Sequence, residues 1–260
     1  MKTLYKHVHL VIDDKREYLD GSILIEDGII EDVFIHSNKT FDNTEEIDTK
    51  GKIFIPAFFD SKSKTKKQKE VVKRFVCSKK LLNEPMHLIC DKKMPKNRNV
   101  FAVSRIRNQN KVKGIKTFIN PACLKIKNID AVSDITKQTK VNLNSNKIIN
   151  YALNNSCVIE FGIDRKLSDE YIKFILKNID SNRILLISYG HDDIIDQIKR
   201  LKKLNVSLTD IVAMTSINPY NFYGNRKQDG YLIKGKPANI VCLDKNMNLE
   251  YVLIKGEQNA

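Results

Sequence analysis

The sequence predicts an α/β protein in which β structure at both ends of the chain flanks a region of alternating strands and helices. The chain begins with short strand-like runs, at Tyr5–Ile12 and on both sides of Asp27-Gly28, a pair typical of hairpin turns. It ends with two similar runs, Ala238–Leu243 and Glu250–Ile254. Between these ends, strand-like segments alternate with longer helical ones, which is typical of a mainly parallel sheet or barrel.

The central region contains the apolar, β-rich runs expected of buried strands: Ile53–Asp60, Met86–Cys90, Val100–Ser104, Gly114–Ile119, Val158–Ile163 and Arg183–Ser188. A helix is expected after Ser168, a suitable N-cap, because Asp169 and Glu170 in its first turn complement the helix dipole. A second helix is expected from about Asp193 to Leu204, with isoleucines and leucine on one face and basic residues on the other. Asp192 or Asp193 is its expected N-cap.

The central region is short for a complete barrel. From Pro56 to Arg226 there are about 170 residues, whereas a full eight-stranded (β/α) barrel usually takes about 200–250. We therefore predict a shortened or incomplete TIM-like (β/α) barrel, with two of the eight strands missing or vestigial. The basic, Asn-rich stretch Lys125–Asn150 carries little strand signal and is the expected trimmed region.

Composition excludes several classes of protein. A hydrophobic fraction of 42% is enough to fill a core, and no apolar run approaches the ~20 residues that span a bilayer. Residues 1–7 lack the apolar stretch of a secretory signal, so we expect a cytoplasmic protein with no membrane partner. The five cysteines are scattered and never spaced C-x-x-C, so we expect neither disulfides nor a zinc ribbon. Cys123 and Cys157 are interpreted as small packed residues.

The net charge of +14 is consistent with a polyanionic partner, either nucleic acid or a phosphorylated ligand. Most of the bases are lysines, accompanied by abundant Asn and Ile, which is also how a compositional bias of the coding sequence would look. Neither an aromatic RNA-binding signature nor a basic helix-turn-helix is present. A nucleic-acid-associated protein therefore stays an alternative that rests on charge alone.

Three segments, in order, resemble the amidohydrolase superfamily. Ile23–Ile30 followed by Gly51–Asp60 (GKIFIPAFFD) is similar to that family's entry into its barrel, usually written P-G-F-I-D. Asp210–Pro219 (DIVAMTSINP) resembles the last barrel helix with its T-x-N-P-A element, and Gly235–Val241 (GKPANIV) resembles the turn back into a small β domain. The resemblance implies a barrel domain at 56–226 and a small β-sandwich domain formed by both termini, at 1–55 and 227–260.

Two inner segments point to the N-acetylglucosamine-6-phosphate deacetylase branch. Glu160–Asp164 and Arg183–Gly190 look like the A-D-G-I-H and L-V-T-D-A segments of that branch. The resemblance implies amino-sugar metabolism and a hydrolase of amide C–N bonds, in which a divalent metal activates water and an aspartate is the general base. Relatives of this family often dimerise through the barrel, so a homodimer is one candidate assembly, and the sequence leaves the oligomeric state open.

The positions that carry this chemistry are changed in this chain. Where the family has His-x-His after its first barrel strand, this sequence has Lys62 and Lys64, whose ammonium groups have no lone pair for a metal. The glutamate ligand has no counterpart in Gly114–Pro121, the general-base position is occupied by Tyr189, and a substrate-contacting histidine by Asp164. We therefore predict a pseudoenzyme with no catalytic residue, no metal and no other cofactor.

The candidate site residues follow from the same positions. Lys62, Lys64, Lys66 and Lys67 form a basic cluster. A solvated basic loop is the preferred interpretation, and a site for a phosphorylated sugar or another anion is the alternative. A candidate pocket contains Asp164, Tyr189 and His191, and a further alternative is a working hydrolase whose metal is held by His191 with nearby carboxylates. His7 and His9 have metal-ligand spacing, but they lie in the first strand, far in sequence from the barrel mouth, and a half-exposed strand face is the preferred interpretation.

Overall fold

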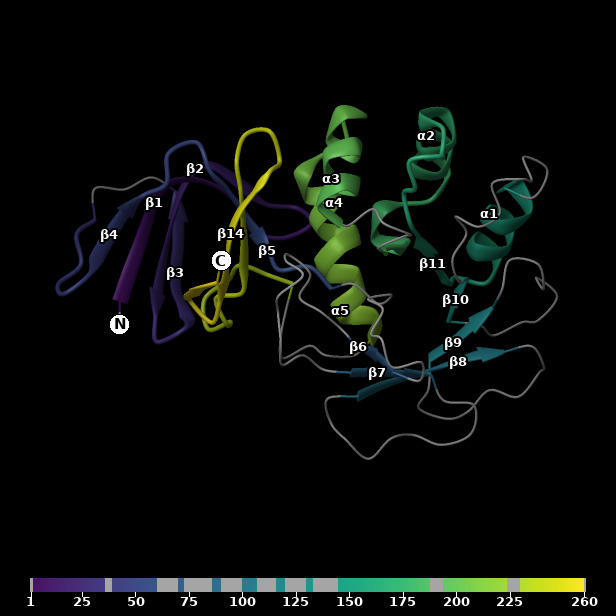
Figure 1. The fold of residues 1–260 in the computed structure, drawn as a ribbon, viewed down its shortest axis with the longest axis horizontal. Coiled ribbons are helices and arrows are strands. Elements are labelled where there is room, and N and C mark those ends of the chain that lie inside the picture. The colour runs from purple at the N-terminus through teal and green to yellow at the C-terminus, as the bar shows by residue number, and fades with distance from the viewer. Residues whose placement is uncertain are drawn as a thin grey trace. The chain divides into compact units, whose positions relative to one another are not determined.

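In the computed structural model, the described residues are 2–35, 39–59, 70–72, 86–89, 100–106, 116–119, 130–132, 145–187, 194–223 and 230–259. The chain divides into two compact units. Unit 1 contains the described residues of 2–59 and 198–259, and unit 2 contains those between 70 and 197. Both ends of the chain lie in unit 1 (Figure 1). The domain boundaries at 55/56 and 226/227 stay predictions.

Unit 1 is built on one mixed sheet to which both ends of the chain contribute. The strand order is β15-β14-β13-β5-β1-β2-β3, and β4 pairs with β1. The N-terminal and C-terminal strands meet where β5 pairs antiparallel with β13, which confirms the small β domain made from both termini. The strands are β1 (Lys2–Val11), β2 (Glu17–Glu26), β3 (Ile29–Ile35), β4 (Glu45–Asp48), β5 (Ile53–Pro56), β13 (Ile240–Leu243), β14 (Leu249–Ile254) and β15 (Glu257–Asn259).

This sheet folds over on itself, which gives the sandwich its interior. Asp27 and Gly28 have φ values of 49° and 81° and form the expected hairpin turn between β2 and β3. The main chain on either side of this turn binds the segment that leads into β13: Gly28 O accepts from Ala238 N at 2.8 Å, and Ile30 O accepts from Gly235 N at 2.7 Å. The edge strand β3 is therefore held against the other half of the same sheet.

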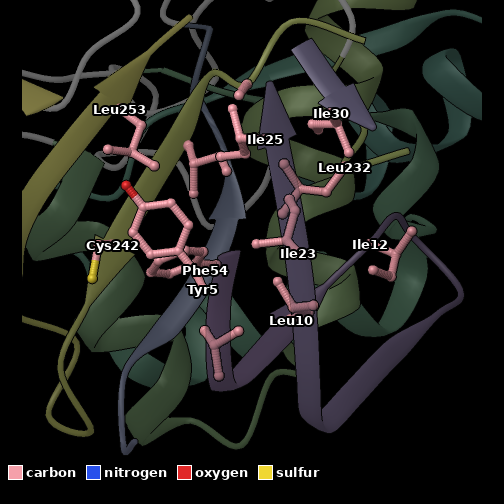
Figure 2. Packing of buried hydrophobic residues seen from close by; sticks show 13 residues of the cluster. Tyr5, Leu10, Ile12, Ile23, Ile25, Ile30, Phe54, Leu232, Cys242 and Leu253 are labelled. Atoms are coloured by element: carbon pink, nitrogen blue, oxygen red, sulfur yellow. The ribbon is translucent and has the colours of Figure 1, made fainter. Parts of the chain in front are cut away.

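The core of unit 1 fills this interior (Figure 2). The ring of Phe54 lies between those of Tyr5 and Tyr251, at centroid distances of 5.4 and 6.3 Å, both edge to face. Tyr5 and Val8 both face this core although three positions separate them, because a β-bulge lies between them and His7 has a φ of 54°. The buried members of the cluster are Tyr5, Val8, Leu10, Ile12, Ile23, Ile25, Ile30, Phe54, Leu232, Ala238, Ile240, Cys242 and Leu253.

Unit 2 contains the barrel-like sheet. Its strands pair in chain order, β7 to β12 all run parallel, and β6 is antiparallel to β7. Parallel strands that pair in chain order form the wall of a (β/α) barrel, and among the described strands none closes the ring. A chain of 260 residues is consistent with the predicted incomplete barrel. The strands are β6 (Glu70–Val72), β7 (Met86–Ile89), β8 (Val100–Ile106), β9 (Lys116–Ile119), β10 (Ala131–Val132), β11 (Val158–Phe161) and β12 (Ile184–Leu186).

The stretch Lys125–Asn150, which the sequence indicates as the trimmed region, still contributes secondary structure in its described residues. It contains β10 and the first turns of α1 (Ser145–Asn154). β10 has two fully buried residues and pairs with β9 on one side and β11 on the other. A strand of two residues has no visible period-2 pattern, so its position is decided by its neighbours in the sheet. This strand is vestigial rather than missing.

The helices that the sequence predicts are present. In α2 (Asp169–Asn178), the Ser168 side chain accepts a hydrogen bond from Tyr171 N, which confirms the predicted N-cap. The buried apolar face of α3 (Ile194–Lys203) is confirmed, whereas its expected caps Asp192 and Asp193 lie outside the described residues. The remaining helical elements are η3 (Ser181–Arg183), α4 (Leu208–Val212), the π-helix η4 (Ala213–Ile217) and α5 (Asn218–Tyr223). No helix in the described part of the chain is long and apolar enough to cross a bilayer.

Candidate functional site

The described residues include the strand ends that lead into the candidate site. Of the candidate site residues, they include Asp164. Asp164 follows β11 and is half-buried. The other candidates lie outside the described residues: Lys62, Lys64, Lys66, Lys67, Tyr189 and His191.

In unit 1, the segment after β5 is fixed by the last helical region of the chain. Phe59 N donates to Thr215 O at 2.8 Å, and Ser216 Oγ donates to Pro56 O at 3.2 Å. The rings of Phe59 and Tyr220 pack edge to face, with centroids 5.1 Å apart. All five residues are buried. The main chain is thus held in place up to three residues before Lys62.

A π-helical turn, η4, makes these contacts available, and it was not predicted from the sequence. In a regular α-helix, Thr215 O would accept from the N–H of residue 219, but Pro219 has none. Asn218 N instead donates to Ala213 O, five residues back, so Thr215 O is left to accept from Phe59. The proline within the Asn218-Pro219 pair was the signal that could have revealed this turn.

In unit 2, the ends of β11 and β12 are joined through one buried side chain. Gln197 on α3 is 1% exposed. Its Oε1 accepts from Ile163 N at 2.8 Å, and its Nε2 donates to Ile187 O at 2.9 Å. Ile187 N also donates to Phe161 O at 3.0 Å, which extends the strand pairing by one bond. The signal that could have identified Gln197 is its place within the apolar face of α3, between Ile194 and Leu201.

Asp164 organises the turn that follows β11. Its Oδ1 accepts from Lys166 N at 2.8 Å, and its main-chain oxygen accepts from Leu167 N at 3.0 Å. This arrangement leaves the side chains of Arg165 and Lys166 exposed at the carboxyl end of the strand. Neither basic residue was singled out from the sequence, nor was Glu160, a carboxylate on β11 that is only 4% exposed.

The divalent metal that the family chemistry implies would be bound at positions such as Lys62 and Lys64, which lie outside the described residues. Among the residues that the structure describes, no three His, Cys, Asp or Glu side chains gather where they could hold an ion. At the described strand ends, Asp164 is the available carboxylate, and its Oδ1 is engaged by the turn.

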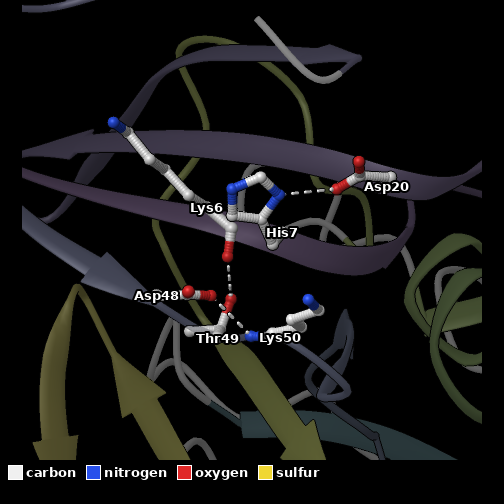
Figure 3. A network of polar contacts seen from close by, with 6 residues as sticks. All are labelled: Lys6, His7, Asp20, Asp48, Thr49 and Lys50. Carbon is white, nitrogen blue, oxygen red and sulfur yellow. Dashed lines mark hydrogen bonds and ion pairs between the residues drawn. The ribbon is translucent and has the colours of Figure 1, made fainter. Parts of the chain in front are cut away.

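His7 and His9 are each directed to a different carboxylate of β2. His7 Nδ1 lies 3.2 Å from Asp20 Oδ1 (Figure 3), and His9 Nε2 lies 2.8 Å from Glu17 Oε2. The two rings therefore have separate partners and share no ligand position in these contacts. The carbonyl oxygen of Lys6, within the β-bulge at His7, accepts a hydrogen bond of 2.6 Å from the Thr49 hydroxyl. The polar contacts of this region therefore stabilise the sheet.

The two described cysteines are unsuited to nucleophilic chemistry. Cys157 is 2% exposed and Cys242 is fully buried. Burial raises the pKa of each thiol to about 11, so neither forms a thiolate near neutral pH.

Comparison with known proteins agrees with this architecture. A family model described as "Amidohydrolase family" matches residues 141–258, which include α1, β11, β12 and the π-helical turn. No curated protein sequence matches the chain. The chain resembles the amidohydrolase family over these residues, and its fold is similar to that of N-acetylglucosamine-6-phosphate deacetylases.

Three solved structures illustrate the similarity of fold. N-acetylglucosamine-6-phosphate deacetylase from Thermotoga maritima gives a TM-score of 0.64 at 13% identity, over 98% of this chain and 99% of that one. The deacetylase from Mycobacterium smegmatis gives 0.63 at 9% identity, over 99% and 100%. A β-aspartyl dipeptidase from Fervidobacterium islandicum gives 0.56 at 10% identity, over 99% and 96%. At these identities the similarity concerns the fold.

Proposed function

We propose that this protein is a catalytically degenerate relative of N-acetylglucosamine-6-phosphate deacetylase that binds an anionic or phosphorylated ligand without deacetylating it. The observation that supports the proposal most strongly is that the main chain after β5 is held in place shortly before Lys62 and Lys64. The main chain is anchored as far as Phe59 by Thr215, and it leads directly into Ser61-Lys62-Ser63-Lys64, where the family has two histidines. The scaffold of the metal site is retained while its first two ligands are replaced by lysines.

This replacement changes the chemistry from metal binding to anion binding. A lysine ammonium has three donors and no lone pair, so it repels a dication and attracts a phosphate group. Without the metal, neither water activation nor carbonyl polarisation is supplied, and both are needed for amide hydrolysis in this family. Lys66 and Lys67 add positive charge to the same segment, and Arg165 and Lys166 add it at the end of β11.

An assay with metal tests the loss of catalysis. Purified protein is incubated with Zn²⁺ or Fe²⁺ and N-acetylglucosamine 6-phosphate, and release of acetate is measured together with the metal content of the protein. We expect no turnover and no stoichiometric metal. Turnover that requires a bound metal would support an active deacetylase instead and would end the proposal.

Calorimetric titration tests the binding role. The ligands are N-acetylglucosamine 6-phosphate, unphosphorylated N-acetylglucosamine and inorganic phosphate. The double variant Lys62→Gln/Lys64→Gln should bind the sugar phosphate at least about tenfold more weakly, because each charge-assisted hydrogen bond contributes about 1.5–3 kcal/mol. The matched control is Lys202→Gln/Lys203→Gln, which removes the same charge from the exposed face of α3.

The control also separates the alternatives. If both double variants weaken binding equally, the protein attracts anions through net charge and has no site at Lys62 and Lys64. If a single-stranded oligonucleotide binds with a steep dependence on salt and the sugar phosphate does not bind, the nucleic-acid alternative replaces this proposal.

A further inference from the structure

We propose that Gln197 is a positioning residue, which holds the turn Asp164–Leu167 in the conformation in which Arg165 and Lys166 face an anionic ligand. The inference that this turn contacts the ligand rests on the proposed function. The inference that Gln197 sets the turn rests on the geometry alone: one buried amide bonds both the residue that precedes Asp164 and the end of the neighbouring strand.

Packing does not explain a glutamine at this position. The neighbouring residues on this face of α3, Ile194 and Leu201, are apolar and buried, and a leucine would fill the space. A buried amide without partners is unfavourable, so its presence is explained by the bonds that it makes. Both atoms of the amide are used: Oε1 accepts from Ile163 N and Nε2 donates to Ile187 O. Among the neutral side chains of this length, only glutamine offers a donor and an acceptor side by side.

The consequence of these bonds is a fixed starting point for the turn. Ile163 N is the last main-chain donor before Asp164, and the strand β11 ends at Phe161. Beyond the strand, the bond to Gln197 takes the place of a ladder bond. Asp164 then closes the turn through Lys166 N, which directs the sequence Arg165-Lys166 outward at the carboxyl end of the sheet. In parallel α/β proteins, ligands bind at this end of the strands.

The chain contains a matched control at the opposite end of the same strand pair. Arg183, directly before β12, donates through one guanidinium nitrogen to Ala152 O and, at 2.9 Å, to Cys157 O, directly before β11. Arg183→Met therefore also removes two side-chain to main-chain hydrogen bonds that join elements around β11 and β12. These bonds lie at the amino ends of the strands, away from the turn 164–167.

The first test needs no ligand. Hydrogen–deuterium exchange is followed in peptides covering residues 158–168 for the wild type, Gln197→Met and Arg183→Met. We expect exchange of the amides of Ile163–Lys166 to be at least about tenfold faster in Gln197→Met and unchanged in Arg183→Met. Unchanged exchange at these amides in Gln197→Met would show that the turn holds itself, and it would overturn the proposal.

The second test follows the ligand. Gln197→Met should bind N-acetylglucosamine 6-phosphate about three- to tenfold more weakly than the wild type, whereas Arg183→Met should bind it equally well even where it loses as much thermal stability. Equal losses of affinity in the two variants would indicate a general loss of structure and would contradict a positioning role. If the wild type itself does not bind the sugar phosphate, the proposed function fails, and the exchange experiment alone decides the role of Gln197.

A third variant, Gln197→Glu, should give a pH dependence of ligand affinity that a residue with only a structural role would not give. In Gln197→Glu, a protonated carboxyl group can accept from Ile163 N and donate to Ile187 O, whereas a carboxylate can only accept. The affinity of Gln197→Glu for the sugar phosphate, divided by that of the wild type at the same pH, should therefore fall several-fold between pH 5 and pH 8. A constant ratio would contradict the proposal, and dividing by the wild type removes the titration of the phosphate itself.

Discussion

The main-chain N–H of Phe59 donates a hydrogen bond of 2.8 Å to the carbonyl oxygen of Thr215, across more than 150 positions of the sequence. Pro219 makes this bond available, because it cannot donate to Thr215 as a residue within an α-helix would. The result is a fixed main chain at the point where the sequence enters Ser61-Lys62-Ser63-Lys64. The barrel entry therefore depends on a helix from the other end of the chain.

Ser216→Ala tests the energetic value of this junction. It removes the hydrogen bond from Ser216 Oγ to Pro56 O, where Ser216 is fully buried, so the free energy of unfolding should fall by about 1–2 kcal/mol. Thr44→Ala is the control, because its hydroxyl also donates to a carbonyl oxygen, Asp42 O, but at the surface. Denaturation in urea should show a change below about 0.5 kcal/mol for the control. Equal losses in the free energy of unfolding for the two variants would mean that burial does not strengthen the hydrogen bond of Ser216.

Gly28 and Gly235 allow the energetic cost of a left-handed backbone to be distinguished from the cost of a steric clash. Gly28 and Gly235 both have a φ of +81°. An added Cβ at Gly235 would meet nothing within 4 Å, whereas at Gly28 it would lie 2.6 Å from Lys255 O. Gly235→Ala should therefore cost about 1 kcal/mol from the left-handed backbone alone, and Gly28→Ala about 1–3 kcal/mol more. Thermal unfolding of the two variants measures the difference, and similar costs would show that the turn at Gly28 moves freely away from Lys255.

The buried thiol of Cys242 predicts a loss of stability in alkaline solution. Burial raises the pKa of this thiol from 9.0 to about 11, so between these values the unfolded thiol ionises while the native one stays protonated. The native state then binds more protons, and its stability falls as the pH rises; below pH 9 the contribution is complete. Between pH 8 and pH 11 the wild type should lose on the order of 2 kcal/mol more than Cys242→Ala. If the free energy of unfolding falls equally with pH in the wild type and in Cys242→Ala, the loss of stability does not come from the Cys242 thiol.

Asp164→Asn tests the electrostatics of the turn after β11 and rests on the proposed function. Asparagine can still accept from Lys166 N, so the turn is kept, while the negative charge beside Arg165 and Lys166 is removed. Affinity for N-acetylglucosamine 6-phosphate should rise about two- to fivefold at low salt, and less at high salt. Titration at two salt concentrations measures both effects. A fall in affinity would indicate instead that the Asp164 carboxylate contacts the ligand.

The candidate site could be predicted from the sequence in part. The motifs located β11 and β12, and Asp164 lies three residues after the end of β11. The sequence did not identify Gln197, Arg165 or Thr215. Gln197 and Thr215 bind main-chain groups that are distant in sequence, and Arg165 lies in a turn that Gln197 helps to fix. A polar residue in an apolar helix face and a proline in a helical segment were the visible signals, and each has several explanations until the partner is known.

The sequence by itself determined the local elements of this protein. The Asp27-Gly28 hairpin, the Ser168 cap and the strands at both termini follow from backbone preferences and hydrogen bonds within a few residues, which any structure of the chain must satisfy. The tertiary structure decided the rest. Whether Ala131–Val132 is a strand, whether one sheet folds into a sandwich, and what Gln197 binds all depend on bonds between distant segments. These bonds form only when the whole chain brings their partners together, so no local pattern encodes them.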